Sequence, residues 1–352
     1  MKQRVFVGLS GGVDSSVAAK RLIESGYDVT GVFIKTWQPD FIPCTWEAER
    51  RDAMRVAASL GIPFLTCDAE AAYRDDVAGY MIREYAAGRT PNPDVMCNKY
   101  VKFGTFLSFA KAHGADKVAT GHYARMEQQG DEYILMRGKD TEKDQSYFLW
   151  TLNQEQRAAL LFPIGDTEKS DIRREAKRAG LPTHAKEDSQ GICFLGEIDM
   201  KEFLMHMVDT TPGTVRNEQG EQIGTHDGAL LYTIGQRHGF AITDPASKEV
   251  PQYVISKDIE SNTITVAPHQ KTAQGSVIRL REVNWIGAPV NDTLSAQFRY
   301  RQKPFTVSVE AQGEGNAVCT VQGDVESPSL GQSCVFYDGD TCRGGGIIDA
   351  VE

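Results

Sequence analysis

Near its start the chain reads Gly8-Leu9-Ser10-Gly11-Gly12-Val13-Asp14-Ser15-Ser16. The run before it, residues 4–9, is short, apolar and β-branched, which is typical of a strand buried on both faces. The run after it, residues 13–25, has apolar side chains at helical spacing and is followed by Gly26, a residue type that often ends helices. A helix that begins on two glycines offers unpaired amide groups to an anion. We therefore expect a phosphate-binding turn here.

This turn lacks the lysine of a Walker A loop, and Asp14 stands inside it. A carboxylate beside bound phosphates is expected to help hold a hydrated Mg²⁺ that neutralises pyrophosphate. Ser-Gly-Gly-x-Asp-Ser-Ser after a first strand resembles the PP-loop of ATP pyrophosphatases, which cleave ATP between the α and β phosphates and adenylate an oxygen of the substrate. A glycine-rich turn of purely conformational purpose is the other interpretation, but it needs neither the serines nor Asp14.

The composition indicates an ordinary soluble protein of two or three domains, with 352 residues, of which 41% are hydrophobic and 24% charged. The apolar run at the N-terminus is broken by Gly8 and Ser10 and is too short for a signal peptide, and no stretch is long enough to span a membrane. We expect a cytoplasmic protein. A net charge of −10 argues against broad non-specific binding of nucleic acid. Local basic segments occur at 169–178, where a solvated helix face is the alternative, and at 299–303.

The seven cysteines show no C-x-x-C spacing, which argues against a zinc knuckle or a clustered iron–sulfur site, so we expect no protein metal centre. An odd number of cysteines in a cytoplasmic chain fits free thiols. They are Cys44, Cys67, Cys97, Cys193, Cys319, Cys334 and Cys342.

Strand and helix patterns alternate up to about residue 200. Strands are expected at 28–34, 63–68 and 117–120, and helices at 47–60 and 101–113. This alternation predicts an α/β domain with a doubly wound parallel sheet, whose ligands bind at the carboxyl ends of the strands. Ile34 and Gly121 would then lie beside the phosphate turn, at the adenine and ribose, although core packing and a simple turn explain each of them taken alone.

Beyond residue 200 a helix at 200–208 is followed by short strand patterns, among them 229–233, 254–258 and 263–267, which indicate a small β-rich domain. A third part has the strand lengths and spacing of an antiparallel β-barrel. We place the domain boundaries at 1–205, 206–272 and 273–352. The barrel strands are expected at 277–285, 294–300, 305–311, 318–322, 334–337 and 347–351.

Two cysteines stand in unusual segments. Cys97 follows the proline-stiffened loop 89–96, and a position near a helix N-terminus beside Lys99 would lower its pKa. Asp94, three residues earlier, would serve as acid or base. Cys193 lies in the glycine-containing segment 187–195, and only the fold can bring it to Cys97. Inert or buried thiols are the alternative reading. Two thiols and an adenylating loop in one domain suggest sulfur transfer through a persulfide, with a disulfide left for reduction.

Over nearly its whole length the chain resembles the bacterial tRNA-specific 2-thiouridylases, also called tRNA-uridine 2-sulfurtransferases. The motifs that carry the resemblance are 8–16, 92–98, 120–123, 143–149, 188–194, 232–237, 299–302, 331–332 and 344–347. The resemblance implies that the wobble uridine of tRNAs for Lys, Glu and Gln is flipped out, adenylated on its 2-oxygen and thiolated, with release of AMP and pyrophosphate.

The resemblance also implies roles for single residues. Cys193 carries the persulfide, Cys97 is the nucleophile, and Asp94 and Asp14 complete the catalytic set. ATP, with Mg²⁺, binds to Gly8, Leu9, Ser10, Gly11, Gly12, Val13, Asp14, Ser15, Ile34 and Gly121, with Ile34 standing where the family more often has Met or Leu. The anticodon stem-loop of tRNA contacts Asn92, Pro93, Asp94, His122, Lys143, Asp144, Gln145, Arg299, Tyr300 and Gln332.

The implied partners are tRNA and a sulfur donor, either a cysteine desulfurase or a sulfur-relay carrier protein, and the implied enzyme is a monomer that does not bind membranes. Two other functions fit parts of the sequence. An amide-forming PP-loop synthetase acting on a small molecule would use the same turn but needs no pair of cysteines. A non-catalytic tRNA-binding protein would have no use for Asp14 beside the phosphates.

Overall fold

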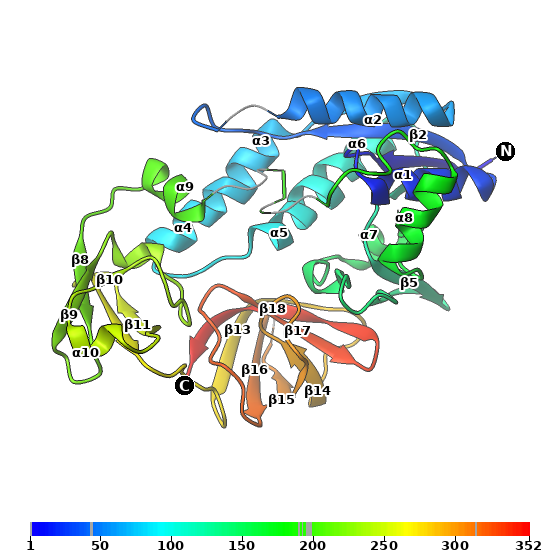
Figure 1. The fold of residues 1–352 in the computed structure, drawn as a ribbon. Coiled ribbons are helices and arrows are strands. Elements are labelled where there is room, and N and C mark those ends of the chain that lie inside the picture. The colour runs from blue at the N-terminus through cyan, green and yellow to red at the C-terminus, as the bar shows by residue number, and fades with distance from the viewer. Residues whose placement is uncertain (1, 43–44, 189–190, 192, 195–198, 314) are drawn as a thin grey trace.

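A computed structural model describes residues 2–42, 45–188, 191, 193–194, 199–313 and 315–352. The chain forms an α/β part, a small β-rich part beside it and a β-barrel packed against the α/β part (Figure 1). Within the described residues, no helix has both the length and the apolar character needed to cross a membrane.

The predicted parallel sheet is confirmed, with the strand order β3-β2-β1-β4-β7. Its first strand lies in the middle, where Val7 pairs with Gly31 on one side and Ala119 on the other. The carboxyl ends of β1, β2 and β4 therefore meet at one edge. The strands are β1 (Arg4–Gly8), β2 (Asp28–Lys35), β3 (Phe64–Asp68), β4 (Lys117–Ala119) and β7 (Leu160–Leu161). The helices packed around them include α1 (Val13–Glu24), α2 (Trp46–Leu60), α7 (Gln154–Ala158) and α8 (Lys169–Arg178).

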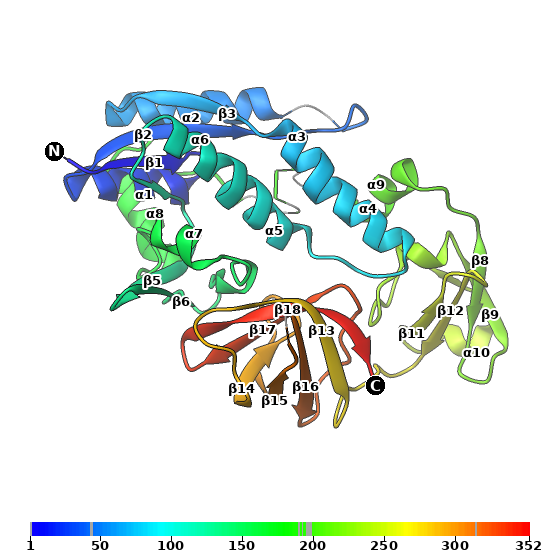
Figure 2. The ribbon, with the colours of Figure 1, turned by 180° about the vertical axis from the view of Figure 1, so that it is seen from behind.

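Two long helical segments lie between the sheet and the barrel, and both contain π-helical turns (Figure 2). The predicted helix at 101–113 begins earlier than expected, at Pro93, because the side chain of Asn92 accepts a hydrogen bond from the Val95 amide (3.3 Å) and proline suits a first helical position. Cys97 therefore lies inside a helix. The segments are α3 (Glu70–Ala72), η1 (Tyr73–Ala78) and α4 (Gly79–Ala86), then α5 (Pro93–Met96), η2 (Cys97–Thr105) and α6 (Phe106–Ala112).

The β-rich part forms a five-stranded sheet in the order β10-β9-β8-β12-β11. The predicted strand at 229–233 is wrong, because Ala229–Leu231 forms a short 3₁₀ turn, η4, after Gly228, whose φ is +142°. Its apolar side chains are buried in a turn instead of a ladder. The elements are α9 (Met200–Met207), β8 (Gly213–Arg216), β9 (Gln222–His226), β10 (Ala241–Ile242), α10 (Pro245–Lys248), β11 (Tyr253–Asp258) and β12 (Thr263–Ala267).

The C-terminal antiparallel barrel is also confirmed, and it closes through pairing of its first and last strands. A hairpin of the α/β part joins it, since Met136 pairs with Thr341. The barrel strands are β13 (Val277–Trp285), β14 (Asp292–Gln297), β15 (Phe305–Ala311), β16 (Asn316–Gln322), β17 (Ser333–Asp338) and β18 (Thr341–Val351). The hairpin consists of β5 (Ala124–Gln129) and β6 (Glu132–Arg137), and the turn η3 (Ser146–Phe148) follows.

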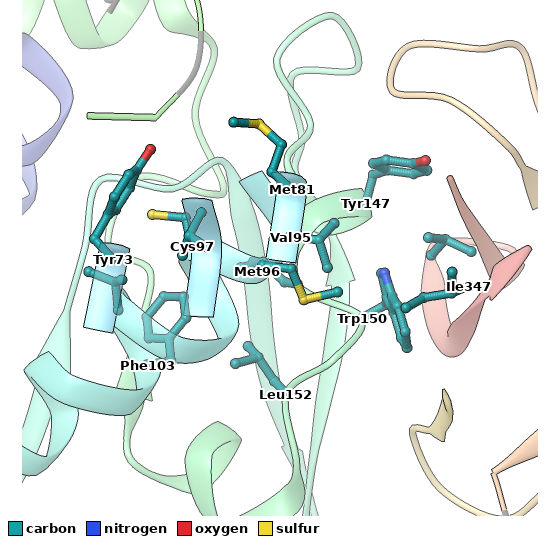
Figure 3. Close-up of a cluster of buried hydrophobic side chains, with 14 of the residues drawn as sticks. Tyr73, Met81, Val95, Met96, Cys97, Phe103, Tyr147, Trp150, Leu152 and Ile347 are labelled. Carbon is teal, nitrogen blue, oxygen red and sulfur yellow. The ribbon is translucent and has the colours of Figure 1, made fainter. Parts of the chain in front are cut away.

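One apolar core runs from the Cys97 helix into the barrel (Figure 3). Trp150, 1% exposed, packs beside Ile347, and its indole nitrogen donates to Ser333 Oγ (3.1 Å). The hydroxyl of Tyr147 donates to the carbonyl of the same Ser333 (2.9 Å). The barrel is therefore fastened directly beside the helix that carries Cys97.

Trp150→Ala should lower the free energy of unfolding by about 3–5 kcal/mol, because it leaves a large cavity in this shared core. Denaturant unfolding followed by circular dichroism measures the change. Met54→Ala, at an exposed position of α2, is the control and should change stability by no more than about 0.5 kcal/mol. Equal effects of the two substitutions would show that the core does not bind the barrel to the α/β part.

Candidate active site

The predicted phosphate turn has the backbone of an anion site. Gly11 has φ +71°, and a Cβ there would lie 2.7 Å from the Cβ of Asp52, so only glycine fits. Gly12 precedes α1, and no described side chain caps the helix. The first amides of α1 are therefore available to an anion. The Ser10 hydroxyl lies 3.3 Å from the Gly12 amide, which donates to it, and 3.4 Å from the Ser15 hydroxyl.

The residues expected at the nucleoside surround the same strand end. A Cβ on Gly121 would lie 2.6 Å from the Ser15 nitrogen, so glycine allows the segment after β4 to touch the start of α1. Ile34, 6% exposed, ends 3.7 Å from the Cβ position of Gly8. The fold thus brings Gly8, Ile34 and Gly121 to the phosphate turn, while their contacts with a nucleotide stay predictions.

Asp14 is held by two partners from distant parts of the chain. The Tyr123 hydroxyl donates to it at 2.8 Å, and the ammonium of Lys169 reaches both carboxylate oxygens at 2.7 and 2.8 Å. Lys169, 8% exposed at the start of α8, also pairs with Asp188 at 2.7 Å. One buried cation therefore bridges two carboxylates at the phosphate turn.

Asp188 forms two further ion pairs, with Lys143 at 2.9 Å and with Arg173 at 2.7 Å. Burial alone would raise the pKa of Asp188, but the hydrogen bonds from Lys169 and Lys143 outweigh it and hold the pKa at about 2. Lys169 is a site residue that the sequence alone does not predict, because the basic run 169–178 indicates a charged helix but not which of its residues turns inward.

Asp14, which we expected to help hold Mg²⁺, already pairs with the ammonium of Lys169. Within the described part of the chain, no three His, Cys, Asp or Glu side chains gather as a metal site. Both oxygens of Asp14 accept from Lys169. A magnesium ion that keeps its own waters and takes most ligands from phosphates still fits here, because it needs only one or two carboxylates.

The fold brings the two cysteines of interest together. Cys97 is fully buried at the start of η2, and its thiol lies within hydrogen-bonding reach of the Cys193 thiol. Two further bonds hold the Cys193 backbone, whose amide donates to Asp94 (3.0 Å) and whose carbonyl accepts from Tyr73 (2.8 Å). Figure 3 shows the Cys97 sulfur directed toward Tyr73. Two facing π-helical segments, η1 and η2, supply Tyr73 and Cys97 to this site, and π-helical segments are frequent at functional sites.

Asp188 ties this pair to the phosphate turn. It precedes Cys193 by five residues, and five residues span at most roughly 18 Å. The pair therefore lies within one short segment of Lys169 and Asp14. Ser189 and Gln190, in the same motif, lie outside the described residues.

The expectation of a low pKa at Cys97 is wrong. Burial raises the pKa of the Cys97 thiol well above its usual value, and the neighbouring Cys193 adds to the rise. Lys99 gives no help, because its ammonium lies 3.9 Å from Glu282 and over the ring of Tyr100. The pKa of Cys193 is instead lowered, first by the hydrogen bond from Cys97 and then by the charge of Lys102. Of the two thiols, Cys193 is therefore the one whose pKa falls and Cys97 the one whose pKa rises.

Burial raises the pKa of Asp94, against the opposing effect of its bond from the Cys193 amide. A carboxyl group with a raised pKa next to two thiols is suited to carry a proton. Its neighbour Asn98 bonds to the Asp94 carbonyl (2.9 Å) and so fixes the turn.

Several residues expected to contact tRNA have internal partners. His122 is 6% exposed and bonds to Thr120 (2.6 Å), and burial lowers its pKa well below the usual value. Asp144, 8% exposed, pairs with Arg137 (3.0 Å). Gln145 accepts from the Tyr123 amide (3.0 Å). In this conformation these side chains support the loops of the site, and contact with tRNA stays a prediction for them.

Of the tRNA contacts expected from the barrel, Gln332 bonds to the loop that leads to Cys97. The Gln332 amide donates to the carbonyls of Thr90 (2.9 Å) and Pro91 (3.1 Å). Tyr300 packs on Phe148 with ring centroids 4.6 Å apart, and Arg299 pairs with Glu326 (3.0 Å).

Comparisons with known proteins cover almost the whole chain. Three family models match: a tRNA methyl transferase HUP domain over residues 3–197, a tRNA methyl transferase PRC-barrel domain over 201–268 and an aminomethyltransferase beta-barrel domain over 276–348. Among curated relatives, tRNA-specific 2-thiouridylase MnmA of Geobacillus thermodenitrificans is 46% identical, and that of Listeria monocytogenes 45% identical. Each match covers 99% of this chain and 95% of the relative.

Likeness to solved structures is weaker. A 4-thiouridine synthetase–RNA complex with bound ATP matches with a TM-score of 0.34 and 19% identity, over 54% of this chain and 44% of that one. This likeness is too slight to support a conclusion about the chemistry.

The carboxylate of Asp188 should make the fold sensitive to acid. Its folded pKa of about 2 lies below the unfolded value, so its contribution of roughly 2 kcal/mol is present above about pH 4 and is lost as the pH falls toward 2. Asp188→Asn should therefore lower the free energy of unfolding at pH 6 but flatten its decline between pH 5 and 3, measured by denaturant unfolding. Asp324→Asn, at an exposed position, should follow the parent protein. An unchanged acid decline in Asp188→Asn would contradict the ion-pair network.

Proposed function

This chain belongs to the tRNA-specific 2-thiouridylases, sulfurtransferases that use ATP to form 2-thiouridine in tRNA, and we propose that Cys193 carries the sulfur and that Cys97 attacks Cys193 to release it. The observation that carries the proposal is the meeting of these two thiols one short segment away from the phosphate turn. An amide-forming synthetase has no use for such a pair.

We propose that the first step activates the base. The α1 amides and Lys169 would face the phosphates of ATP, and Gly121 and Ile34 the nucleoside. The target is the wobble uridine of tRNAs for Lys, Glu and Gln, flipped from its stack because its 2-carbonyl is otherwise out of reach. Adenylation of the uracil 2-oxygen releases pyrophosphate and turns a poor leaving group into AMP. Magnesium, bound mainly by phosphates, would supply charge neutralisation beside Asp14.

In the second step the sulfur is transferred to the base, and both cysteines take part. The terminal sulfur of a Cys193 persulfide bonds to C2 of the activated uracil, and the C2–O bond breaks with AMP as leaving group. Cys97 loses its proton, with Asp94 as candidate acceptor, and attacks the Cys193 sulfur. This attack breaks the S–S bond between Cys193 and the transferred sulfur, which stays on C2 as the 2-thio group. A disulfide forms between the two cysteines, and an external thiol reductant must restore both thiols.

We also propose where the substrate and partners bind. Asn92, Pro93 and Asp94 would contact the base. Gln332, which bonds to the loop before them, would hold the stem-loop together with Lys143, Arg299 and Tyr300. Base contacts and local cations would give recognition, because a net charge of −10 gives no general attraction. A cysteine desulfurase or a sulfur carrier would load Cys193. We place the enzyme in the cytoplasm as a monomer with domains at 1–205, 206–272 and 273–352.

Cys97→Ser and Cys193→Ser should each abolish 2-thiouridine formation, because one loses the resolving thiol and the other the sulfur carrier, while ATP still binds. Mass spectrometry of nucleosides from undermodified tRNA, incubated with protein, ATP, Mg²⁺ and a persulfide source, measures the product.

Cys319→Ala, which changes a buried thiol of the barrel core, is the matched control and should leave the product yield intact. Full 2-thiouridine formation by both serine variants would refute the assignment. Pyrophosphate release that needs no tRNA but a small carboxylate would instead favour the amide-forming synthetase.

A further inference from the structure

The charge of Lys102 acts on both thiols of the pair, and the proposed function gives it no role. It lies on η2, five residues after Cys97, where it is partly buried. Its ammonium lies 5.7 Å from the centre of the Phe194 ring, directly after Cys193 in the chain, and is a hydrogen-bonding partner of the Cys193 sulfur. Phe194 has φ +68°, a conformation that needs support in a residue with a Cβ.

The charge of Lys102 has a sulfur partner in place of a carboxylate. Within the described residues, Lys102 forms no ion pair with Asp or Glu at 4.0 Å or less, and Asp94 acts on it only from a longer distance. Burial alone would lower the pKa of Lys102, but the sulfurs of Cys193 and Cys97 raise it to about 12. An ammonium that is shielded from water is costly unless it is paired, and the sulfur of Cys193 is the partner that lies beside it.

We propose that Lys102 is a positioning residue that holds the Cys193 sulfur as the anion which accepts sulfane sulfur from a persulfidated thiol. In this step the Cys193 thiolate attacks the terminal sulfur of R–S–SH. The new bond gives Cys193–S–SH, the S–S bond of the donor breaks, and the donor leaves as R–S⁻. The role deepens the proposed function and rests on it.

The groups around Cys193 explain why a cation is needed. Asp94 and Cys97 face it from the same helix as Lys102, and Tyr73 faces it from η1. His122, beyond Lys102, is buried and neutral, because burial and Lys102 both lower its pKa. Lys102 is therefore the one cation among these neighbours, which otherwise offer a carboxyl group, a thiol and a phenol.

The experiment measures alkylation of Cys193 by iodoacetamide as a function of pH, resolved by site with mass spectrometry, in the full-length protein. The parent protein should show an inflection below the ordinary thiol pKa of about 8.5. Lys102→Met should react at least tenfold more slowly at pH 7 and recover at high pH. Lys102→Arg should keep most of the rate, because the charge remains. Lys99→Met, which removes a cation from the same helix, is the control and should match the parent.

Loading of Cys193 by glutathione persulfide, detected as a mass gain of one sulfur, should change in parallel across these variants. An ordinary inflection in the parent protein would overturn the proposal without any variant, as would a parent-like rate in both Lys102→Met and Lys102→Gln. Pyrophosphate release with unmodified tRNA is assayed alongside and should persist in Lys102→Met. If the parent protein forms no 2-thiouridine at all, the proposed function is wrong. The alkylation rates still decide separately whether Lys102 controls the ionisation of Cys193.

Discussion

The ion pairs of Lys169 with Asp14 and Asp188 connect the two halves of this site. Asp14 stands at the start of α1, and Asp188 begins the segment that carries Cys193. Without a buried cation, two carboxylates this close would repel each other, and the segment would have no reason to lie against the phosphate turn. The ammonium of Lys169 thus holds the segment that carries Cys193 close to the phosphate turn, although the two are far apart in the sequence.

The two thiols lie side by side, yet their surroundings shift their pKa values in opposite directions. Cys97 is enclosed by the core and keeps its proton, whereas Cys193 has a donor thiol and a lysine beside it. The roles proposed for them differ for that reason: Cys193 accepts the sulfur, and Cys97 acts later, when it must be deprotonated. Asp94, held against the Cys193 amide, lies where that proton would go.

The parts of the structure that local chemistry specifies could be predicted from the sequence. The glycine turn before α1, the parallel sheet and the antiparallel barrel each have a signature within a few residues. Lys169 and Lys102 could not be predicted as site residues, because their importance comes from Asp14 and Cys193, which only the fold brings near. The lowered pKa expected for Cys97 failed for a similar reason, since burial is not visible in a motif. At 229–233 an apolar run was consistent with a strand, and Gly228 makes it a turn.

Gln332 belongs to the barrel, yet both of its amide hydrogen bonds go to the backbone just ahead of the Cys97 helix. The barrel is consequently not an independent substrate-binding domain, because it contacts the loop that leads to Cys97. A nucleic acid bound to the barrel would therefore act on a domain that also contacts the backbone ahead of the thiol-bearing helix, so substrate binding would be mechanically coupled to the position of Cys97.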